Sequence, residues 1–538
     1  MARRPARSSP RHPAPQRERV GWLPQLIGIV IAPAAWVAQM ALSAMSIGRT
    51  CRPVSLPLIA VSLVCFAIGM AALVVAWLSW RRSRTESAGE GKSTLDIGEG
   101  RTRFLALLSV CTNGLFLIAM LFTGSAFLLV PECQNDASVS PFTADDVAQG
   151  AYMARVGDCT SCHTAPGQPA YAGGFAIHSP LGTIYGTNIT PDRTYGIGAY
   201  SLADFDRAVR KGVARDGHHL YPAMPYPSFA RMDDRDVRSL YAYFMTDVPA
   251  AHIQPPQTRL PFPLNLRWGI WFWDAVFLHK GAYVPQAGRD AQWNRGAYLV
   301  LGPGHCGGCH TPRNIAYAEK DTSGRALVFL SGTDVDTWHA ADLRGDRDTG
   351  LGVWPEDDIA GFLKTGHALG PQGHDVQAMG SMVQVVENST QYMSDDDRRA
   401  IARYLKSLDG KGPSPTFTPT PVASVFEAPG AGLYAQDCAS CHGATGGGKD
   451  GVFPRLAGNP VVLSKSPTSL IHLVLAGGKP PQTEGASPSK SMPAFGQKLN
   501  DRETADVLSY IRTHFGNHAG AVTEPQVRSL RGKLRPGS

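Results

Sequence analysis

The pentapeptide Cys-x-x-Cys-His occurs three times in this 538-residue chain and constrains its fold more than any other feature. The copies run from Cys159 to His163, from Cys306 to His310 and from Cys438 to His442. On one helical turn, thiols three residues apart can both reach the vinyl groups of a porphyrin, and the next imidazole then lies under the iron. The pattern predicts three covalently bound heme c groups, attached through Cys159, Cys162, Cys306, Cys309, Cys438 and Cys441.

Zinc binding, a redox-active cysteine pair and a chance match all fit the motif less well. A zinc ribbon needs paired Cys-x-x-Cys units close together in sequence, whereas these units lie far apart and each has its own His. A thioredoxin-like redox pair or a chance match can account for one copy, but three copies with the same His are not expected from either. We therefore expect three separate heme sites.

A methionine downstream of each motif is expected to complete the iron coordination. Tyr-Pro-Ala-Met-Pro contains Met224, and Ser-Met-Pro contains Met492. Met379 and Met382 compete in the middle segment, where Met382 is preferred and Met393 is a more remote candidate. Core packing is the usual role of a methionine, but a Met-Pro in a loop before a helix suits a distal ligand better. The predicted axial ligands are His163, Met224, His310, Met382, His442 and Met492.

The three motifs belong to an internal repeat. Gly-Ala-Tyr precedes the first and second motifs, and a helix with a central tyrosine (Tyr243, Tyr404 or Tyr510) closes each segment. The tyrosine is expected to pack against the helix that leads into the motif. We call the segments repeat 1 (143–250), repeat 2 (288–410) and repeat 3 (425–518), and we expect an all-α fold with three class I-like cytochrome c domains. Linkers cover 251–287 and the Pro-rich 411–424, and a basic tail covers 519–538.

Aromatic residues are concentrated in the first linker, between Arg267 and Trp273. This stretch is either packed between repeats 1 and 2 or exposed as a docking or membrane-interface surface. We favour packing.

Three uncharged apolar runs precede the repeats: Trp22–Ile47, Val54–Trp80 and Phe104–Val130. Each exceeds the roughly 20 residues needed to cross a bilayer, so residues 21–131 are predicted to form three transmembrane helices rather than buried core helices. Arginines cluster in the basic segment 1–20 and between the second and third runs, which places both on the cytoplasmic side. The alternative interpretation of the first run is a cleaved signal peptide instead of a transmembrane helix. In either case the repeats lie in the periplasm.

The remaining cysteines and the polar residues of the runs have less specific roles. Cys65 and Cys111 are expected to act as small apolar residues, whereas Cys51 and Cys133 lie at outer helix ends and form either a disulfide or two free thiols. The polar residues of the runs are expected either to form interhelical hydrogen bonds or to line a quinone pocket; they are Gln25, Gln39, Thr112 and Asn113. The net charge of +7 gives a nucleic-acid partner little support.

The repeats resemble the triheme cytochrome c subunits of membrane-bound bacterial dehydrogenases that oxidise alcohols, gluconate, sorbitol, aldehydes or N-heterocycles. The likeness covers about residues 144–516 and rests on long matches such as Gly182–Asp192, Leu220–Tyr226 and Trp293–Val300. It implies His/Met ligation and a catalytic partner subunit of flavin, quinone or molybdenum type. Electrons would pass from that partner to ubiquinone or an oxidase.

The chain departs from that family at two places. Relatives usually carry Trp-x-Ala-Pro-Asn-Leu where this chain has Trp338 to Leu343, with Ala341 and Asp342 in place of the Pro and Asn. The second heme pocket is therefore expected to be altered. Relatives also hold the membrane through a C-terminal helix, whereas three N-terminal spans do so here.

These features predict an electron-transfer subunit of the bacterial inner membrane that has no catalytic residues of its own. Six-coordinate hemes have no open iron position, so they relay electrons more readily than they bind substrate. A self-contained heme enzyme of peroxidase type is the alternative, and it requires an open-coordinate heme in repeat 2. An oxidase-type membrane module is disfavoured because the apolar runs contain no His to hold heme b or copper.

Overall fold

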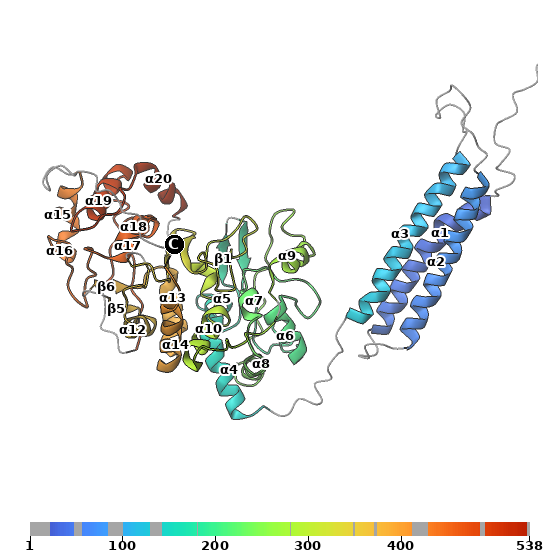
Figure 1. Cartoon of the computed structure of the whole chain (residues 1–538), viewed down its shortest axis with the longest axis horizontal. Coiled ribbons are helices and arrows are strands. Elements are labelled where there is room, and N and C mark those ends of the chain that lie inside the picture. The colour runs from blue at the N-terminus through green and yellow to red at the C-terminus, as the bar shows by residue number, and fades with distance from the viewer. Residues whose placement is uncertain are drawn as a thin grey trace, which may run out of the picture. The chain divides into compact units, whose positions relative to one another are not determined.

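The computed structural model describes residues 22–47, 56–83, 101–129, 142–179, 181–279, 281–347, 350–370, 374–410, 429–484 and 490–534. The chain divides into two units, Met1–Val139 and Ser140–Ser538 (Figure 1). Each unit is described by itself.

The first unit contains helices α1 (Trp22–Ile47), α2 (Leu56–Arg82) and α3 (Arg101–Leu129), and each packs against the other two. Large apolar side chains point outward, among them Leu63, Leu115 and Phe122. Such faces suit lipid better than water. The stretches Ile59–Arg82 and Thr102–Gly124 are long and apolar enough to cross a membrane, while the apolar part of α1, Leu26–Leu42, is shorter.

Two buried amides link these helices. Gln39 donates to the Met120 carbonyl at 3.3 Å and to the Ser62 hydroxyl at 3.4 Å, and Asn113 donates to the Gly28 carbonyl. Interhelical hydrogen bonding is thus confirmed for Gln39 and Asn113. Cys65 is buried in the same interior, as expected of a small apolar residue, and Cys111 is exposed. The side chain of Gln25 and the predicted Cys51–Cys133 bridge lie outside the described residues.

The second unit holds the repeats, and most of its regular secondary structure is helical. In and after repeat 1 the elements are α4 (Ala144–Val156), α5 (Cys159–His163), β1 (Ala176–Ser179), β2 (Gly182–Tyr185), α6 (Leu202–Lys211), α7 (Tyr226–Phe229), α8 (Asp234–Thr246) and α9 (Gly269–Phe277). Repeat 2 contains α10 (Ala291–Leu301), α11 (Gly307–His310), β3 (Ser331–Val335), β4 (Trp338–Asp342), α12 (Glu356–Thr365), β5 (His367–Gly370), β6 (His374–Gln377), α13 (Ser381–Asn388), the 3-10 helix η4 (Thr390–Tyr392) and α14 (Asp395–Lys406).

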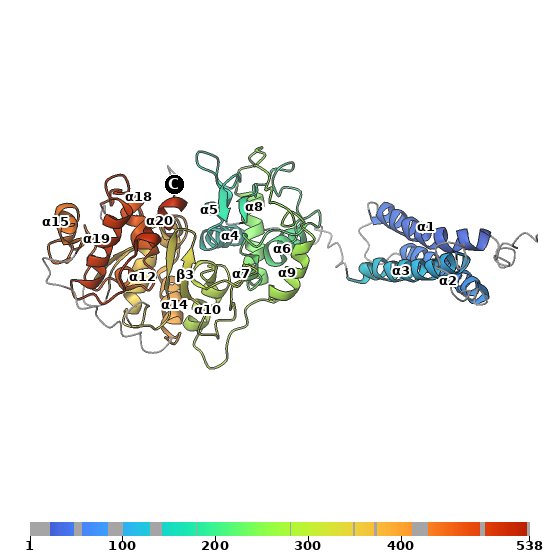
Figure 2. The ribbon, with the colours of Figure 1, turned by 90° about the horizontal axis from the view of Figure 1, so that it is seen from above.

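Helices α15 (Ala431–Asp437), α16 (Ala439–His442), α17 (Pro460–Leu463), α18 (Thr468–Ala476), α19 (Asp501–Thr513) and α20 (Glu524–Lys533) complete the chain. Figure 2 shows α15, α18, α19 and α20 at one end of this unit and α4 to α9 at the other, with β3, α10 and α14 between them. The segment predicted as a basic tail contains α20, which buries Val527 and Leu530 against repeat 3.

A glycine-centred helix crossing recurs in repeats 1 and 2. A Cβ atom on Gly150 of α4 would lie 1.9 Å from the Ser239 carbonyl oxygen of α8, and one on Gly296 of α10 would lie 1.9 Å from the Ala400 oxygen of α14. Only glycine permits so close an approach of two backbones. The Gly in each Gly-Ala-Tyr sequence therefore sets the packing of the first helix on the closing helix.

The predicted tyrosine packing is observed at these crossings. The Cβ atoms of Tyr243 and Tyr404 lie directly beside Gly150 and Gly296, respectively. In repeat 3 the ring of Tyr510 lies 5.6 Å from that of Tyr434 on α15. Each closing helix thus contacts the helix that leads into its motif.

Repeats 1 and 2 share one hydrophobic core, whereas repeat 3 has its own. The shared core contains Phe244 and Met153 from repeat 1 together with Leu299 and Tyr404 from repeat 2. The second core gathers residues of α15, α18, α19 and α20. The boundary between the two cores lies between repeats 2 and 3.

The interface between repeats 1 and 2 is reciprocal. The Tyr152 hydroxyl of α4 donates to Asp397 of α14 at 2.6 Å, and the Tyr298 hydroxyl of α10 donates to Asp236 of α8 at 2.6 Å. Both tyrosines end a Gly-Ala-Tyr sequence, and both aspartates are the third residue of a closing helix. Each repeat thus offers its partner the same pair of groups. Arg295 also binds Asp397, through two hydrogen bonds of 2.8 and 2.7 Å.

In the part of the chain that the structure describes, three antiparallel hairpins depart from the all-α expectation: β1–β2, β3–β4 and β5–β6. Each has two short strands, and the pairs Ile177–Ile184 and Thr333–Ala340 mark the register of the first two. The hairpins lie in connections between helices, where strands of four or five residues leave too short an alternation to be recognised in the sequence.

Candidate functional site

The three motifs fold alike, each as a short helix directly after the first helix of its repeat. They form α5, α11 and α16, which follow α4, α10 and α15. None of the six motif cysteines is in a disulfide, so each can form a thioether bond. This placement matches the predicted use of one helical turn to present two thiols and an imidazole.

Each motif histidine binds a backbone carbonyl through Nδ1. The acceptors are Thr187 for His163 at 2.6 Å, Ala341 for His310 at 2.8 Å and Pro454 for His442 at 2.9 Å. A proton on Nδ1 leaves Nε2 as the lone-pair nitrogen, and the fixed ring orientation suits a metal ligand. Burial lowers the pKa of all three imidazoles, which favours the neutral form that binds iron.

Two cavities contain the predicted ligands. One of about 3130 Å³ is lined by Cys159, Cys162, His163 and Met224. A second, of about 1080 Å³, is lined by the motifs of repeats 2 and 3 together with Met382 and Met492. Both equal or exceed the upper end of the roughly 300–1,000 Å³ found for small-molecule sites. The space, the thiol pairs and the oriented imidazoles fit a covalently attached heme in each repeat.

Hydrogen bonds join the loop that contains Met224 to α9 and to the segment just before it. Tyr221 donates to the Leu264 carbonyl at 2.9 Å, and Tyr226 donates to Asp274 at 2.6 Å. His219 binds the same carboxylate at 2.7 Å. Residues on both sides of Met224 are thus fixed to the first linker, so its thioether enters the cavity from a rigid loop.

Met492 is positioned by a backbone bridge. Its N–H donates to the Gly478 carbonyl at 2.8 Å, and the Gly478 N–H donates back at 3.0 Å. Gly477 has a positive φ of 74°, and a Cβ there would lie 2.6 Å from the Met492 oxygen. The glycine pair therefore permits the bridge that holds Met492.

The three candidate methionines of repeat 2 all line the second cavity but differ in surroundings. The Met379 sulfur lies beside Gly478 of repeat 3, only 3.2 Å from the position a Cβ would take there. Met393 is 4% exposed and belongs to the shared core. Met382 is half-buried in the first turn of α13. The choice of Met382 among the three stays a prediction.

The prediction that the aromatic stretch of the first linker is packed between repeats 1 and 2 is confirmed for part of the stretch and wrong for the rest. Trp273 donates to the Ala316 carbonyl at 2.8 Å and lies beside the Tyr226 ring, as predicted. Trp268, Trp271 and Phe272 are 64%, 56% and 57% exposed. Helical periodicity separates Trp273 and the buried Asp274 on one face of α9 from these three on the other.

We call the predicted heme sites of repeats 1, 2 and 3 site 1, site 2 and site 3. The motifs of repeats 1 and 2 are close neighbours. His305, which precedes Cys306, contacts the Gly157 carbonyl through Nε2 at 3.3 Å. Asn388 of repeat 2 donates to Ser161, inside the first motif, at 2.9 Å. Site 2 also shares the second cavity with site 3. Site 2 therefore adjoins both of the others.

Sequence reasoning missed the groups that orient the motif histidines. Backbone carbonyls carry no side-chain signature, so Thr187 and Pro454 had no signal of their own. Ala341 lies in the stretch where the second pocket was expected to be altered, and its carbonyl still accepts the His310 proton. The Pro-to-Ala difference leaves that acceptor in place.

Comparison with known proteins gives consistent matches. The cytochrome c family profile matches residues 427–515. The alcohol dehydrogenase (quinone) cytochrome c subunit of Gluconacetobacter polyoxogenes is 46% identical over 404 residues, which is 73% of this chain and 85% of that protein. The gluconate 2-dehydrogenase cytochrome c subunit of Pantoea cypripedii is 46% identical over 76% of this chain and 95% of its own length. For the fructose dehydrogenase cytochrome subunit of Gluconobacter japonicus the identity is 37%, with coverage of 72% and 82%.

Proposed function

The chain belongs to the cytochrome c subunits of bacterial dehydrogenase complexes, and from this premise we propose that it carries electrons through three covalently bound hemes. It is the electron-transfer subunit of such a complex and not the catalytic one. The proposed sites are the three repeats, each folded as a class I-like cytochrome c domain.

One observation carries the proposal: all three motif histidines have Nδ1 bound to a backbone carbonyl and face a cavity that a methionine also lines. In each repeat, two thiols would hold the porphyrin while His and Met occupy the two axial positions. The heme supplies reversible one-electron chemistry at iron. The chain supplies attachment, ligand orientation and exclusion of water.

The arrangement of the sites supports a relay in which site 2 adjoins both of the others. Site 1 meets site 2 where His305 contacts Gly157, and site 2 meets site 3 in the shared cavity. A catalytic subunit of flavin, quinone or molybdenum type would supply electrons at one end of this series. Ubiquinone or an oxidase would accept them at the other.

We further propose that α1, α2 and α3 anchor the chain as three spans of the bacterial inner membrane. Their outward apolar faces and their interhelical amide bonds support this role. The basic flanks support an orientation with the N-terminus in the cytoplasm and the heme domains in the periplasm. The Cys51–Cys133 bridge is part of this proposal.

Purification of the native complex tests the function. Detergent-solubilised membranes should yield this chain with a catalytic subunit, whose flavin, quinone or molybdenum content then identifies the substrate class. Adding that substrate should reduce the hemes, and a ubiquinone analogue should reoxidise them. Hemes that stay oxidised with substrate, or peroxidase turnover by the chain alone, would contradict the proposal.

Ligand variants test the choice of methionine in repeat 2. Met382→Ala should remove one third of the long-wavelength absorption band that Met-bound ferric heme shows, while Met393→Leu should leave the band intact. If Met379→Ala removes the band instead, Met379 is the ligand.

A further inference from the structure

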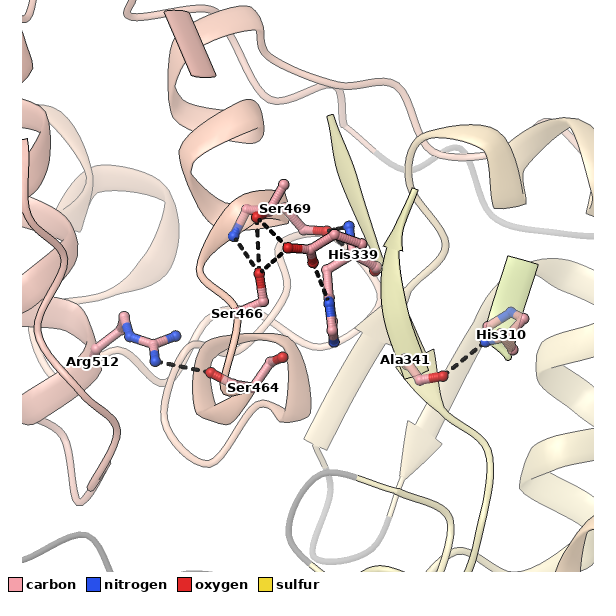
Figure 3. Close-up of polar contacts among 9 residues, drawn as sticks. His310, His339, Ala341, Ser464, Ser466, Ser469 and Arg512 are labelled. Atoms are coloured by element: carbon pink, nitrogen blue, oxygen red, sulfur yellow. Dashed lines mark hydrogen bonds and ion pairs between the residues drawn. The ribbon is translucent and has the colours of Figure 1, made fainter. Parts of the chain in front are cut away.

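We propose that repeat 3 sets the reduction potential of the second heme, and that Trp338 and His472 are the positioning residues through which it does so. This inference rests on the proposed three-heme function. The β3–β4 hairpin belongs to repeat 2, but its tip is docked on repeat 3 (Figure 3). The same hairpin contacts the segments that carry both predicted iron ligands of repeat 2.

Several hydrogen bonds join the hairpin to repeat 3. His339 donates its N–H to the Ser469 hydroxyl at 2.9 Å, and that hydroxyl lies 3.3 Å from the His339 carbonyl. Asp334 accepts hydrogen bonds from Ser466 and Thr468 at 3.1 and 3.3 Å. These contacts hold strands β3 and β4 to the start of α18.

The rings of Trp338 and His472 also form part of this contact between the hairpin and repeat 3. The His472 ring of α18 is stacked on the Trp338 indole with centroids 3.9 Å apart and planes 29° apart. His472 is 8% exposed, and its Nδ1 lies 3.3 Å from the Thr337 carbonyl. Trp338 lines both cavities, so the pair lies at the boundary between the heme sites.

The hairpin also reaches the proximal ligand. Three residues beyond Trp338, the Ala341 carbonyl accepts the His310 Nδ1 proton at 2.8 Å. This bond increases the electron donation of Nε2 and so stabilises ferric iron. Because β4 is continuous from Trp338 to Asp342, a shift of the docked end displaces the carbonyl. Figure 3 shows Ser466 and Ser469 on one side of the hairpin and His310 on the other.

The distal ligand depends on the same tryptophan. Gly380 has a positive φ of 62°, and a Cβ on it would lie 2.5 Å from the Trp338 ring. Gly380 is the N-cap of α13, and Met382 lies in the first turn of that helix. The indole therefore supports the backbone from which Met382 projects.

The other two sites are supported differently. Asn188 follows the Thr187 acceptor of His163 and donates to the Ala251 and Ile253 carbonyls at 2.8 and 3.0 Å, just after repeat 1. The His442 proton is accepted by the Pro454 carbonyl. The preceding residue, Phe453, forms a β-bridge with Lys449 within repeat 3. Among the described residues, a docked neighbouring repeat holds the acceptor strand only at site 2.

His472→Ala in the full-length holoprotein tests the proposal, with His514→Ala as the matched control. His514 is also in repeat 3 and stacks on an aromatic ring, Tyr510, at 4.1 Å and 29°, away from the hairpin. Redox titration should show one of three midpoint potentials shifted upward in His472→Ala, because the proximal hydrogen bond is weakened. The His514→Ala titration should match wild type.

A structural readout accompanies the titration. Deuterium exchange of the peptide 331–343 should be faster in His472→Ala, since loss of the ring stack on Trp338 weakens the docking that holds the His339 N–H against the Ser469 hydroxyl. His472→Phe keeps a flat ring on Trp338 and should restore most of the wild-type potential, and it also serves if the alanine variant misfolds. A Met382→His variant, which lowers the potential of the heme it ligates, identifies the heme that responds.

Unchanged potentials in His472→Ala, or equal shifts in the two alanine variants, would overturn the inference. Failure of the proposed function is distinguishable from this, because the wild-type chain would then contain fewer than three hemes before any variant is compared.

Discussion

The two junctions between repeats are built on different principles. Repeats 1 and 2 share one core and exchange identical Tyr–Asp hydrogen bonds, so each completes the other. Repeats 2 and 3 keep separate cores and meet through local contacts, which include a docked hairpin, small hydroxyl groups, one ring pair and hydrogen bonds from Gln482 and Thr483 to α13 and α12. The first junction is therefore expected to unfold as one cooperative unit, whereas the second can open while both cores persist.

The largest effect is expected at the charged centre of the first junction. Asp397→Ala leaves the Arg295 guanidinium without its carboxylate and should lower the free energy of unfolding of repeats 1 and 2 by about 3 kcal/mol. Asp357→Ala is the control, because Asp357 forms an exposed pair with Arg399 at 3.5 Å and should cost less than about 0.5 kcal/mol. Chemical denaturation of the holoprotein measures both. Equal losses would mean that the Asp397 network stabilises the protein no more than an exposed ion pair does.

A smaller loss is expected at the helix crossing. Gly296→Ala forces α10 away from the Ala400 carbonyl and should cost about 1–3 kcal/mol. Gly361→Ala is the matched control, since no atom lies within 4 Å of the added Cβ in α12, and it should stabilise the protein by about 0.5–1 kcal/mol. Thermal unfolding that ranks the two variants in the reverse order would refute the close crossing.

The reciprocal hydrogen bonds should each contribute about 1 kcal/mol. Tyr152→Phe and Tyr298→Phe each remove one bond to a buried carboxylate, so their losses of unfolding free energy should be similar. Ser466→Ala at the second junction removes an exposed bond to Asp334 and should cost less. If only one tyrosine variant is destabilised, the interface is not symmetric in energy.

Acidification should weaken the first junction by protonating Asp397. Burial raises the pKa of Asp397, but the hydrogen bonds from Arg295 and Tyr152 outweigh burial, and the net pKa is lowered. Its stabilising contribution is therefore complete above the unfolded value of about 3.9 and is lost as pH falls through the folded pKa. Unfolding curves between about pH 5 and 1 (roughly the window of that titration) should show the difference between wild type and Asp397→Ala shrinking towards the acid end. A constant difference would exclude this linkage.

Local sequence signals predicted much of the site and part of the fold. The motif spacing specifies thiols and an imidazole on one turn, and the Gly-Ala-Tyr repeat marks a helix crossing that needs a glycine. Long-range partners were not predictable: the carbonyls that orient His163, His310 and His442 have no residue preference, and the Tyr152–Asp397 bond joins positions 245 residues apart. The short hairpins and α20 were missed because their apolar patterns are brief.

The number of hemes per chain tests the central claim most directly. Intact-mass spectrometry of the denatured, washed protein, together with pyridine hemochrome absorbance, counts covalently attached hemes without reference to activity. Three hemes per chain are predicted, with one lost in each of the double variants Cys159→Ala/Cys162→Ala, Cys306→Ala/Cys309→Ala and Cys438→Ala/Cys441→Ala. Two or fewer hemes on the wild-type chain would contradict the account.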